Sequence, residues 1–116
     1  MRDHTKLIAF ELADEMALLT YMVTKFFPKE EIYGLTSQIK RSAISIPSNI
    51  AEGSRRSSKK DFRNFLLIAY GSGSELETQI EISKKLNFSN SENFKIVEDL
   101  LLQIMKMLNK LCNNLR

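Results

Sequence analysis

The stretch FKIVEDLLLQIMKMLNKLCNNL, residues 94–115, decides the fold of this 116-residue chain. Its apolar residues recur at alternating steps of three and four, which places their side chains on one face of an α-helix. This stripe consists of Phe94, Val97, Leu101, Ile104, Leu108, Leu111 and Leu115. The spacing predicts a long amphipathic helix over about 91–115, and Ser91 can cap its start.

Three more segments show a helical apolar period, and we expect them to form helices over about 3–26, 29–53 and 58–86. Phe27-Pro28 ends the first, because the residue before a proline avoids helical geometry. The stripe that we expect this first helix to bury is Ile8, Leu12, Met16, Leu19, Val23 and Phe26. Four amphipathic helices with short connections can all bury their apolar faces in an antiparallel up-down four-helix bundle. The sequence therefore predicts a single all-α domain over residues 1–116.

The stretch SIPSNIAEGSRRSSKKDF, residues 45–62, is the least regular part of the second helix and the turn after it. Pro47 removes a backbone donor and costs a helix interior about 3 kcal/mol. The apolar period nevertheless continues past it, which predicts a helix kinked near Pro47, with a hydroxyl of Ser45 or Ser48 satisfying the freed backbone group. Gly53 is expected to be the left-handed C′ residue that ends this helix, and Ser57 or Ser58 to cap the next one. Gly34 is a weak point earlier in the helix, where Thr36 or Ser37 can cap a restart.

Composition narrows the class of protein. Four glycines and two prolines in a chain that is 43% hydrophobic are too few turn residues for a β-sandwich or β-barrel. The apolar N-terminal region contains Glu11, Asp14 and Glu15, which argues against a signal peptide or a membrane span. The single cysteine, Cys112, lies on an apolar helix and is expected to be a buried thiol. We expect a soluble, cytoplasmic protein that has no membrane partner.

Positive charge is concentrated between residues 38 and 63, where seven cations face two carboxylates although the whole chain carries only +3. The cations are Lys40, Arg41, Arg55, Arg56, Lys59, Lys60 and Arg63. Cations at a helix N-terminus oppose the helix dipole, so those near residue 60 suggest a role beyond folding. Two interpretations remain open: a surface that contacts phosphates of RNA or DNA, or a solvated turn. The nearby aromatic residues, Phe62 and Phe65, fit the core stripe, so we expect backbone contacts without base-specific readout.

No pattern in the sequence indicates an enzyme, a cofactor or a metal site. His4 and Cys112 are too distant in sequence to suggest a zinc site or a nucleophile–base pair. The segment GSGSE, residues 71–75, lacks the strand–turn–helix context of a phosphate-binding loop. Its region holds small residues that are better suited to letting another helix approach closely: Ala69, Gly71, Ser72 and Gly73.

The segment LLLQIMKML, residues 100–108, is apolar on nearly every face of its predicted helix. In a domain this small, such a helix is expected to be covered by a partner, and self-association supplies one. The side chains that we expect at this interface are Leu100, Leu102, Met105 and Met107.

Residues 35–80 carry a specific motif: SI-x-x-NIAEG-x-x-R, then DF-x-x-FL-x-IA-x-GS-x-x-ELE. The chain thereby resembles the bacterial four helix bundle protein family, also called the ribosomal-RNA intervening-sequence protein family. The resemblance implies an up-down bundle, a barrel-shaped homopentamer and no established enzymatic activity. It also extends to the accessory protein of diversity-generating retroelements, a basic pentamer that is thought to bind nucleic acid and assist a reverse transcriptase. The net charge of +3 departs from these strongly basic relatives.

The polar positions that match the motif are Arg41, Asn49, Glu52, Gly53, Arg56 and Glu75. We expect Pro47, Asn49, Glu52, Gly53 and Glu75 to be structural, with Glu52 or Glu75 pairing with Arg41 across helices. Together, the residues and the resemblance predict a non-catalytic homo-oligomer, with five subunits, that binds RNA through a basic surface at residues 40–63. The alternative is an oligomeric scaffold for protein partners that does not bind nucleic acid.

Overall fold

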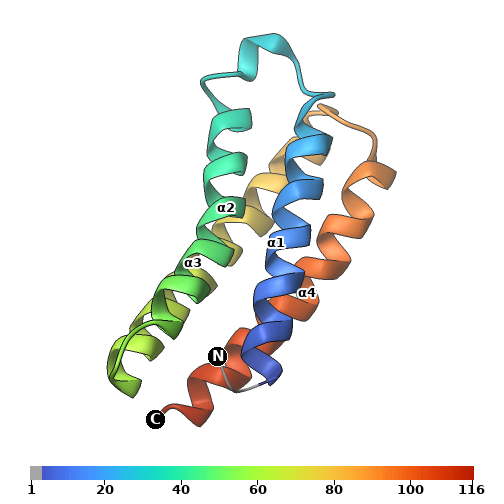
Figure 1. Ribbon diagram of the computed structural model, residues 1–116. Helices are drawn as coiled ribbons and strands as arrows, with labels where there is room; N and C mark the ends of the chain where they lie inside the picture. Colours follow the sequence, from blue (N-terminus) through green and yellow to red (C-terminus); the bar gives the residue numbers. More distant parts are fainter. Residues whose placement is uncertain (1–3) are drawn as a thin grey trace.

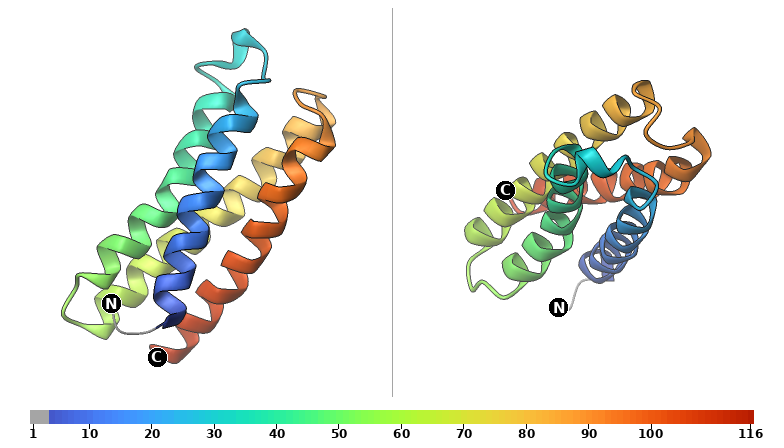
Figure 2. Two further views of the ribbon diagram at one scale, coloured as in Figure 1. Left: turned by 45° about the vertical axis from the view of Figure 1, so that its right-hand side comes forward. Right: turned by 90° about the horizontal axis from the view of Figure 1, so that it is seen from above.

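The computed structural model describes residues 4–116 as four helices and a short 3-10 turn, in a bundle with extents of 43 × 24 × 18 Å (Figure 1). The elements in chain order are α1 (His4–Thr24), η1 (Lys29–Glu31), α2 (Leu35–Ser54), α3 (Lys59–Lys85) and α4 (Ser91–Asn114). Consecutive helices pack together and α4 returns to α1, so each helix has two neighbours (Figure 2). The predicted up-down four-helix bundle is confirmed. No helix in the described range is long and apolar enough to cross a membrane.

The buried face of α1 differs from the predicted one. Helix α1 buries a stripe of mostly small residues, Ala9, Ala13, Met16, Thr20 and Val23, which continues to Phe27 beyond its end. Phe26 and Ile8, placed in the core by the sequence, are 67% and 46% exposed. The alanines allow neighbouring helices to approach closely. Met16 and Val23 of the predicted stripe are buried as expected, and Leu12 and Leu19 are half-buried against the core, whereas Ile8 and Phe26 remain outside. Thr20 fits inside because its hydroxyl donates to the Met16 carbonyl at 2.7 Å.

The start of α2 also differs from the predicted helix over 29–53. The 3-10 turn η1 ends at Glu31, and α2 begins only at Leu35, after Gly34. The Glu31 carboxylate accepts a hydrogen bond from the Leu35 backbone N–H at 3.1 Å. A side chain from the preceding turn therefore caps α2, and the predicted restart at Thr36 or Ser37 is wrong.

Helix α2 continues through Pro47 to Ser54, as the unbroken apolar period predicts. The sequence predicts that the hydroxyl of Ser45 or Ser48 bonds the backbone group that Pro47 leaves free, but both hydroxyl groups have other surroundings. Ser45 shares a 2.8 Å hydrogen bond with Ser72 of α3, and Ser48 is exposed. Asn49 donates to the Ser45 carbonyl at 2.7 Å and to its hydroxyl at 3.0 Å. The polar residues around Pro47 thus join α2 to α3.

Gly53 lies inside the last turn of α2 and is buried against α3. Its backbone is not left-handed, so the predicted C′ role is wrong. A Cβ atom there would stand 2.8 Å from Phe62 Cδ1 and 2.8 Å from Phe65 Cβ. Glycine is required at this position because the end of α2 touches the start of α3.

Local hydrogen bonds set the ends of α3 and the start of α4. Ser58 caps α3 as expected, accepting from the Asp61 N–H at 3.1 Å. Asn87, with φ of 57°, ends α3 in a left-handed conformation, and the Phe88 N–H bonds to the Ser83 carbonyl at 3.1 Å. Asn90, rather than the predicted Ser91, caps α4.

Candidate nucleic-acid interface

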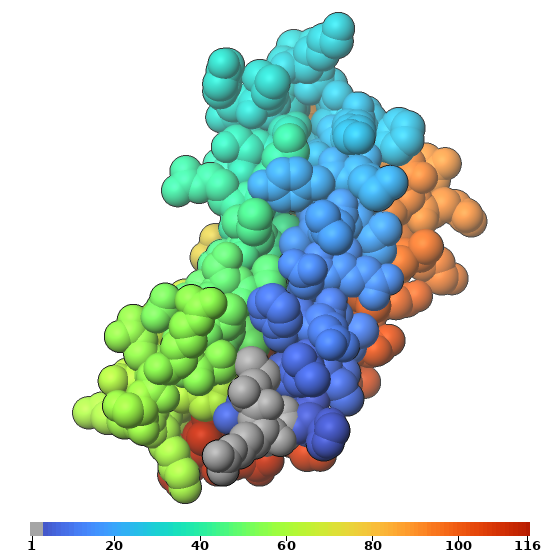
Figure 3. Space-filling view, in the orientation of Figure 1, coloured from blue at the N-terminus to red at the C-terminus, as the bar shows by residue number. Residues whose placement is uncertain are grey.

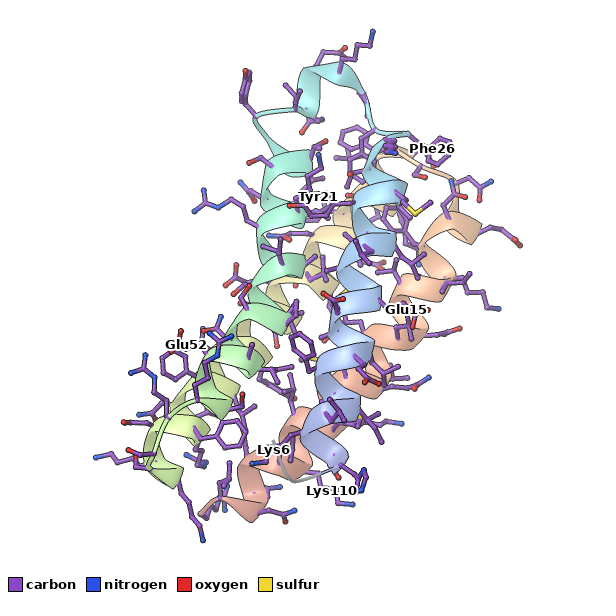
Figure 4. All side chains as sticks on the ribbon, in the orientation of Figure 1. Lys6, Glu15, Tyr21, Phe26, Glu52 and Lys110 are labelled. Carbon is purple, nitrogen blue, oxygen red and sulfur yellow. The ribbon has the colours of Figure 1, made fainter. Side chains whose placement is uncertain are left out.

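The seven cations predicted from residues 38–63 do not form one surface. Arg41 and Arg55 are fourteen residues apart, which along α2 is about 21 Å. Lys40 points toward α1, where its Nζ lies 5.0 Å from the centre of the Tyr21 ring (Figure 4). Arg41, the next residue, lines a groove between α2 and α3 together with Glu75. The cations of α2 are therefore separate from those around the α2–α3 connection.

The α2–α3 connection lies at the same end of the bundle as the last residues of the chain (Figure 3). Two contacts tie this end together. Lys6 of α1 places its Nζ 4.7 Å from the centre of the Phe62 ring of α3. Arg63 of α3 donates from Nε to the Cys112 carbonyl near the end of α4, at 3.2 Å. Lys6 and Lys110 both lie at this end of the bundle (Figure 4).

We call this surface the basic end. It comprises Lys6, Arg55, Arg56, Lys59, Lys60, Arg63, Lys110 and Arg116, with Glu52 and Asp61 as its carboxylates. The remaining residues from 4 to 116 contain eight cations and eleven carboxylates. The charge of the chain is therefore segregated along the bundle axis, with a net +6 at the basic end and −3 elsewhere. Sequence reasoning missed Lys6, Lys110 and Arg116, although the predicted antiparallel topology already places both chain ends beside this connection.

Two cations of the basic end have an ion-pair or hydrogen-bond partner inside the subunit. Arg56 pairs with Glu52 at 3.0 Å and lies over the Phe65 ring, 4.8 Å from its centre. Arg63 holds the end of α4 through the hydrogen bond to Cys112. The ion pairs within residues 4–116 join Glu52 to Arg56 and Lys84 to Glu98, so the expected pairing of Arg41 with Glu52 or Glu75 is wrong.

The available cations of the α2–α3 connection are Arg55, Lys59 and Lys60. All three are exposed, and none has a carboxylate partner in the described part of the chain. Lys59 and Lys60 form the first residues of α3, where the helix dipole disfavours cations, and Arg55 is the residue that follows α2. An anion bound there would be attracted by these side chains and by the helix N-terminus together.

This chain is similar to a known protein family and to a solved structure. A family model described as 23S rRNA-intervening sequence protein matches residues 5–110. The chain belongs to this family. A solved structure described as a protein with unknown function from the S23 ribosomal protein family, from Bacteroides thetaiotaomicron VPI-5482, is 25% identical. The match covers 94% of this chain and 98% of that chain, with a TM-score of 0.85. No curated protein matches.

The four side chains predicted to form an interface between subunits have different surroundings. Met105 is 7% exposed and lies against Gly73 of α3 in the same subunit, so its predicted role is wrong. Leu100 and Met107 are half-buried against the core. Leu102 alone of the four is largely exposed, at 57%. Ala69 and Gly73 do allow close helix packing, whereas Gly71 faces open space.

The exposed apolar side chains of the subunit are more numerous on α1 than the sequence suggests. Leu18 and Met22 are 63% and 57% exposed, in addition to Phe26. Leu18 also lines an apolar groove of about 170 Å³ with Tyr21 of α1 and Ile44 of α2. The apolar surface available to a partner therefore lies on α1 as well as on α4.

No group of three or more His, Cys, Asp or Glu side chains within residues 4–116 could hold a metal ion. Cys112 is buried and carries a free thiol, as predicted. Burial raises the pKa of this thiol above its ordinary value, and the Arg63 guanidinium offsets part of the increase. Because thiolate is the reactive form, both the burial and the raised pKa make Cys112 unreactive in the folded state.

We expect Cys112 to react slowly with a maleimide at neutral pH in native protein and rapidly once urea unfolds the bundle. The increase in labelling rate should follow the loss of helical circular dichroism, since both report exposure of the same core. The single cysteine makes mass spectrometry sufficient to count the modification. Fast labelling of fully folded protein would contradict the burial of this side chain.

Proposed function

We propose that this protein is a non-catalytic, homo-oligomeric RNA-binding protein of the cytoplasm that contacts RNA phosphates through the basic end. The observation that carries this proposal is the charge segregation, with eight cations against two carboxylates at one end of the bundle. A surface of one sign concentrates oppositely charged ligands and releases counterions from nucleic acid on binding. Arg55, Lys59 and Lys60 are the side chains that we expect to contact phosphates most directly.

Two further considerations support RNA as the ligand and an oligomer as the active form. The family is named for an intervening sequence of 23S rRNA, which makes RNA the first polyanion to test. A net charge of +3 is small for one subunit, but an assembly of five copies would present the basic end five times. Linked sites of modest affinity bind a long ligand more tightly than any one site does.

The test compares two triple variants that remove the same charge from opposite ends. Arg55→Gln, Lys59→Gln and Lys60→Gln change the basic end. The matched control changes three exposed cations at the opposite end: Lys25→Gln, Lys29→Gln and Lys85→Gln. RNA affinity is measured by fluorescence anisotropy over a range of salt concentrations, and helical content by circular dichroism.

We expect the basic-end variant to reduce the slope of log affinity against log salt by about 2, at about 0.7 for each lost contact with single-stranded RNA. The control should keep the wild-type slope, because its three side chains lie far from the bound phosphates. Equal slopes for the two variants would show that net charge alone, rather than the basic end, attracts RNA.

The alternative function, an oligomeric scaffold for protein partners, is favoured by the exposed apolar side chains Leu18 and Met22 of α1 and Phe26 just after it. The two functions differ in what nuclease does to a complex isolated from cells. Partners held through RNA should be lost after digestion, whereas partners held by an apolar surface should remain.

A further inference from the structure

The groove between α2 and α3 carries polar groups that phosphate binding at the basic end does not use. Because the two helices are antiparallel, residues whose numbers add to 117 face each other across the groove. The hydrogen bond between Ser45 and Ser72 establishes this register. Ser42 lies opposite Glu75, and Gln38 opposite Gln79, and all of these side chains line adjoining parts of the groove. Its largest polar part has a volume of about 390 Å³.

The groove offers both a positive and a negative group. Arg41 and Glu75 are both exposed and line the same pocket, and neither has an ion-pair partner among residues 4–116. Their guanidinium donors and carboxylate acceptors are therefore available to a ligand. A site that holds both signs of charge suits a molecule that has donors and acceptors side by side, rather than a simple anion.

One acceptor in the groove lacks a partner. The Oε1 atom of Gln79 is buried from solvent and has no hydrogen bond within the described residues. A buried acceptor without a donor is unfavourable, and most such atoms in proteins are paired. Gln79 lies one helical turn after Glu75 on α3, so a rotation that turns its side-chain amide into the groove would let one ligand donate to both and would satisfy this acceptor.

An aromatic side chain stands at one end of the groove. Tyr33, between η1 and α2, lines the same pocket as Arg41, Glu75 and Gln79 and is 94% exposed. An aromatic ring that is almost fully solvated does little for the stability of its own subunit. Rings of this kind provide stacking surfaces for the bases of single-stranded nucleic acid. Tyr33 lies outside residues 38–63, so the pattern of cations in the sequence does not indicate it as a stacking residue.

We propose that this groove binds one unpaired guanine base of an RNA strand, an inference that rests on the proposed RNA-binding function. Guanine presents two neighbouring donors, N1–H and the N2 amino group, beside the acceptors O6 and N7. Glu75 and Gln79 supply the acceptors, and Arg41 supplies donors that match O6 and N7. Tyr33 stacks on the base. Adenine, cytosine and uracil do not present two adjacent donors followed by an acceptor on the pairing edge.

The groove and the basic end can bind the same strand. The groove runs between α2 and α3, and the connection of these two helices carries Arg55, Lys59 and Lys60. The distance of about 21 Å from Arg41 to Arg55 along α2 corresponds to about six stacked nucleotides at 3.4 Å each. A strand longer than this can place a guanine in the groove and its phosphates on the basic end.

The test measures the affinity of an oligouridine strand with one central guanine against the same strand without guanine. We expect wild-type protein to bind the guanine strand about tenfold more tightly. Arg41→Gln with Glu75→Gln, which leaves the net charge unchanged, should abolish this preference and keep the salt slope. The control double variant, Lys106→Gln with Glu77→Gln, also preserves charge at exposed positions and should retain the preference.

Each contrary result identifies which proposal fails. Equal affinity of wild-type protein for both strands would overturn the guanine site alone, if the basic-end variant still reduces the slope of log affinity against log salt. A preference that survives Arg41→Gln with Glu75→Gln would move the base away from the groove, and a preference for another base would overturn the choice of guanine. Binding of neither strand, together with binding of an arginine-rich peptide at Glu75, would overturn both proposals in favour of a protein partner.

Discussion

Replacing Phe27 with alanine is expected to lower the free energy of unfolding by about 3–5 kcal/mol, the usual range for a buried phenylalanine. Phe27 is 7% exposed, and its ring makes edge-to-face contacts with Phe88 and Phe94 at centroid distances of 5.7 and 5.9 Å. These three rings join the end of α1 to the α3–α4 connection and the start of α4. Removing the central ring leaves a cavity that the two other rings cannot fill without moving backbone.

Phe26→Ala is the matched control, since it makes the same chemical change one residue earlier. Phe26 is 67% exposed, so its truncation should change the free energy of unfolding by no more than about 0.5 kcal/mol. Urea unfolding followed by circular dichroism measures both variants. Similar losses for the two would mean that α1 turns the face predicted from its sequence toward the core.

The contrast between α4 and α1 shows what periodicity can establish. In α4 one apolar stripe repeats at helical spacing along the whole helix, and its members from Phe94 to Leu111 are buried as predicted. In α1 two apolar stripes overlap at Met16 and Val23, and elsewhere one has large side chains and the other mostly alanines. Periodicity does not choose between such stripes, because the choice depends on how closely α2 and α4 approach.

The candidate site was predictable in part for a similar reason. The local excess of positive charge along the sequence identifies Arg55, Lys59 and Lys60, because they are neighbours in the chain. It misses Lys6, which reaches the basic end because α1 begins at the end of the bundle where α3 also begins, and its Nζ lies over the Phe62 ring. It also includes Lys40, which lies about 20 Å away along α2 from the basic end. Antiparallel topology, once predicted, would have corrected both errors.

The local partners were harder to predict than the topology. Glu52 pairs with Arg56 instead of with Arg41, because Arg56 follows it by four residues, just after the end of α2, and is the nearest cation. Gly53 fits the pattern of a helix end, yet its role comes from contact with Phe62 and Phe65 of the next helix. Such roles depend on distances between helices, which no local pattern encodes.

Gly53→Ala and Gly71→Ala should change stability in opposite directions, although both replace a glycine inside a helix. Alanine favours a helix over glycine by about 0.5–1 kcal/mol, and this gain applies to both positions. A Cβ atom at Gly71 meets nothing within 4 Å, so this variant should be more stable than wild type by that amount. Urea midpoints at constant m-value measure the change.

At Gly53 the same methyl group must displace α3. It would stand 2.8 Å from Phe65 Cβ, an atom attached to backbone, and 3.3 Å from the Phe62 carbonyl oxygen. Overpacking of this kind costs about 1–3 kcal/mol, which exceeds the helical gain. We therefore expect Gly53→Ala to be the less stable variant by about 1–2 kcal/mol relative to wild type. A stabilising effect equal to that of Gly71→Ala would mean that α2 and α3 are further apart at this end, and that Arg55, Lys59 and Lys60 are carried by a looser connection.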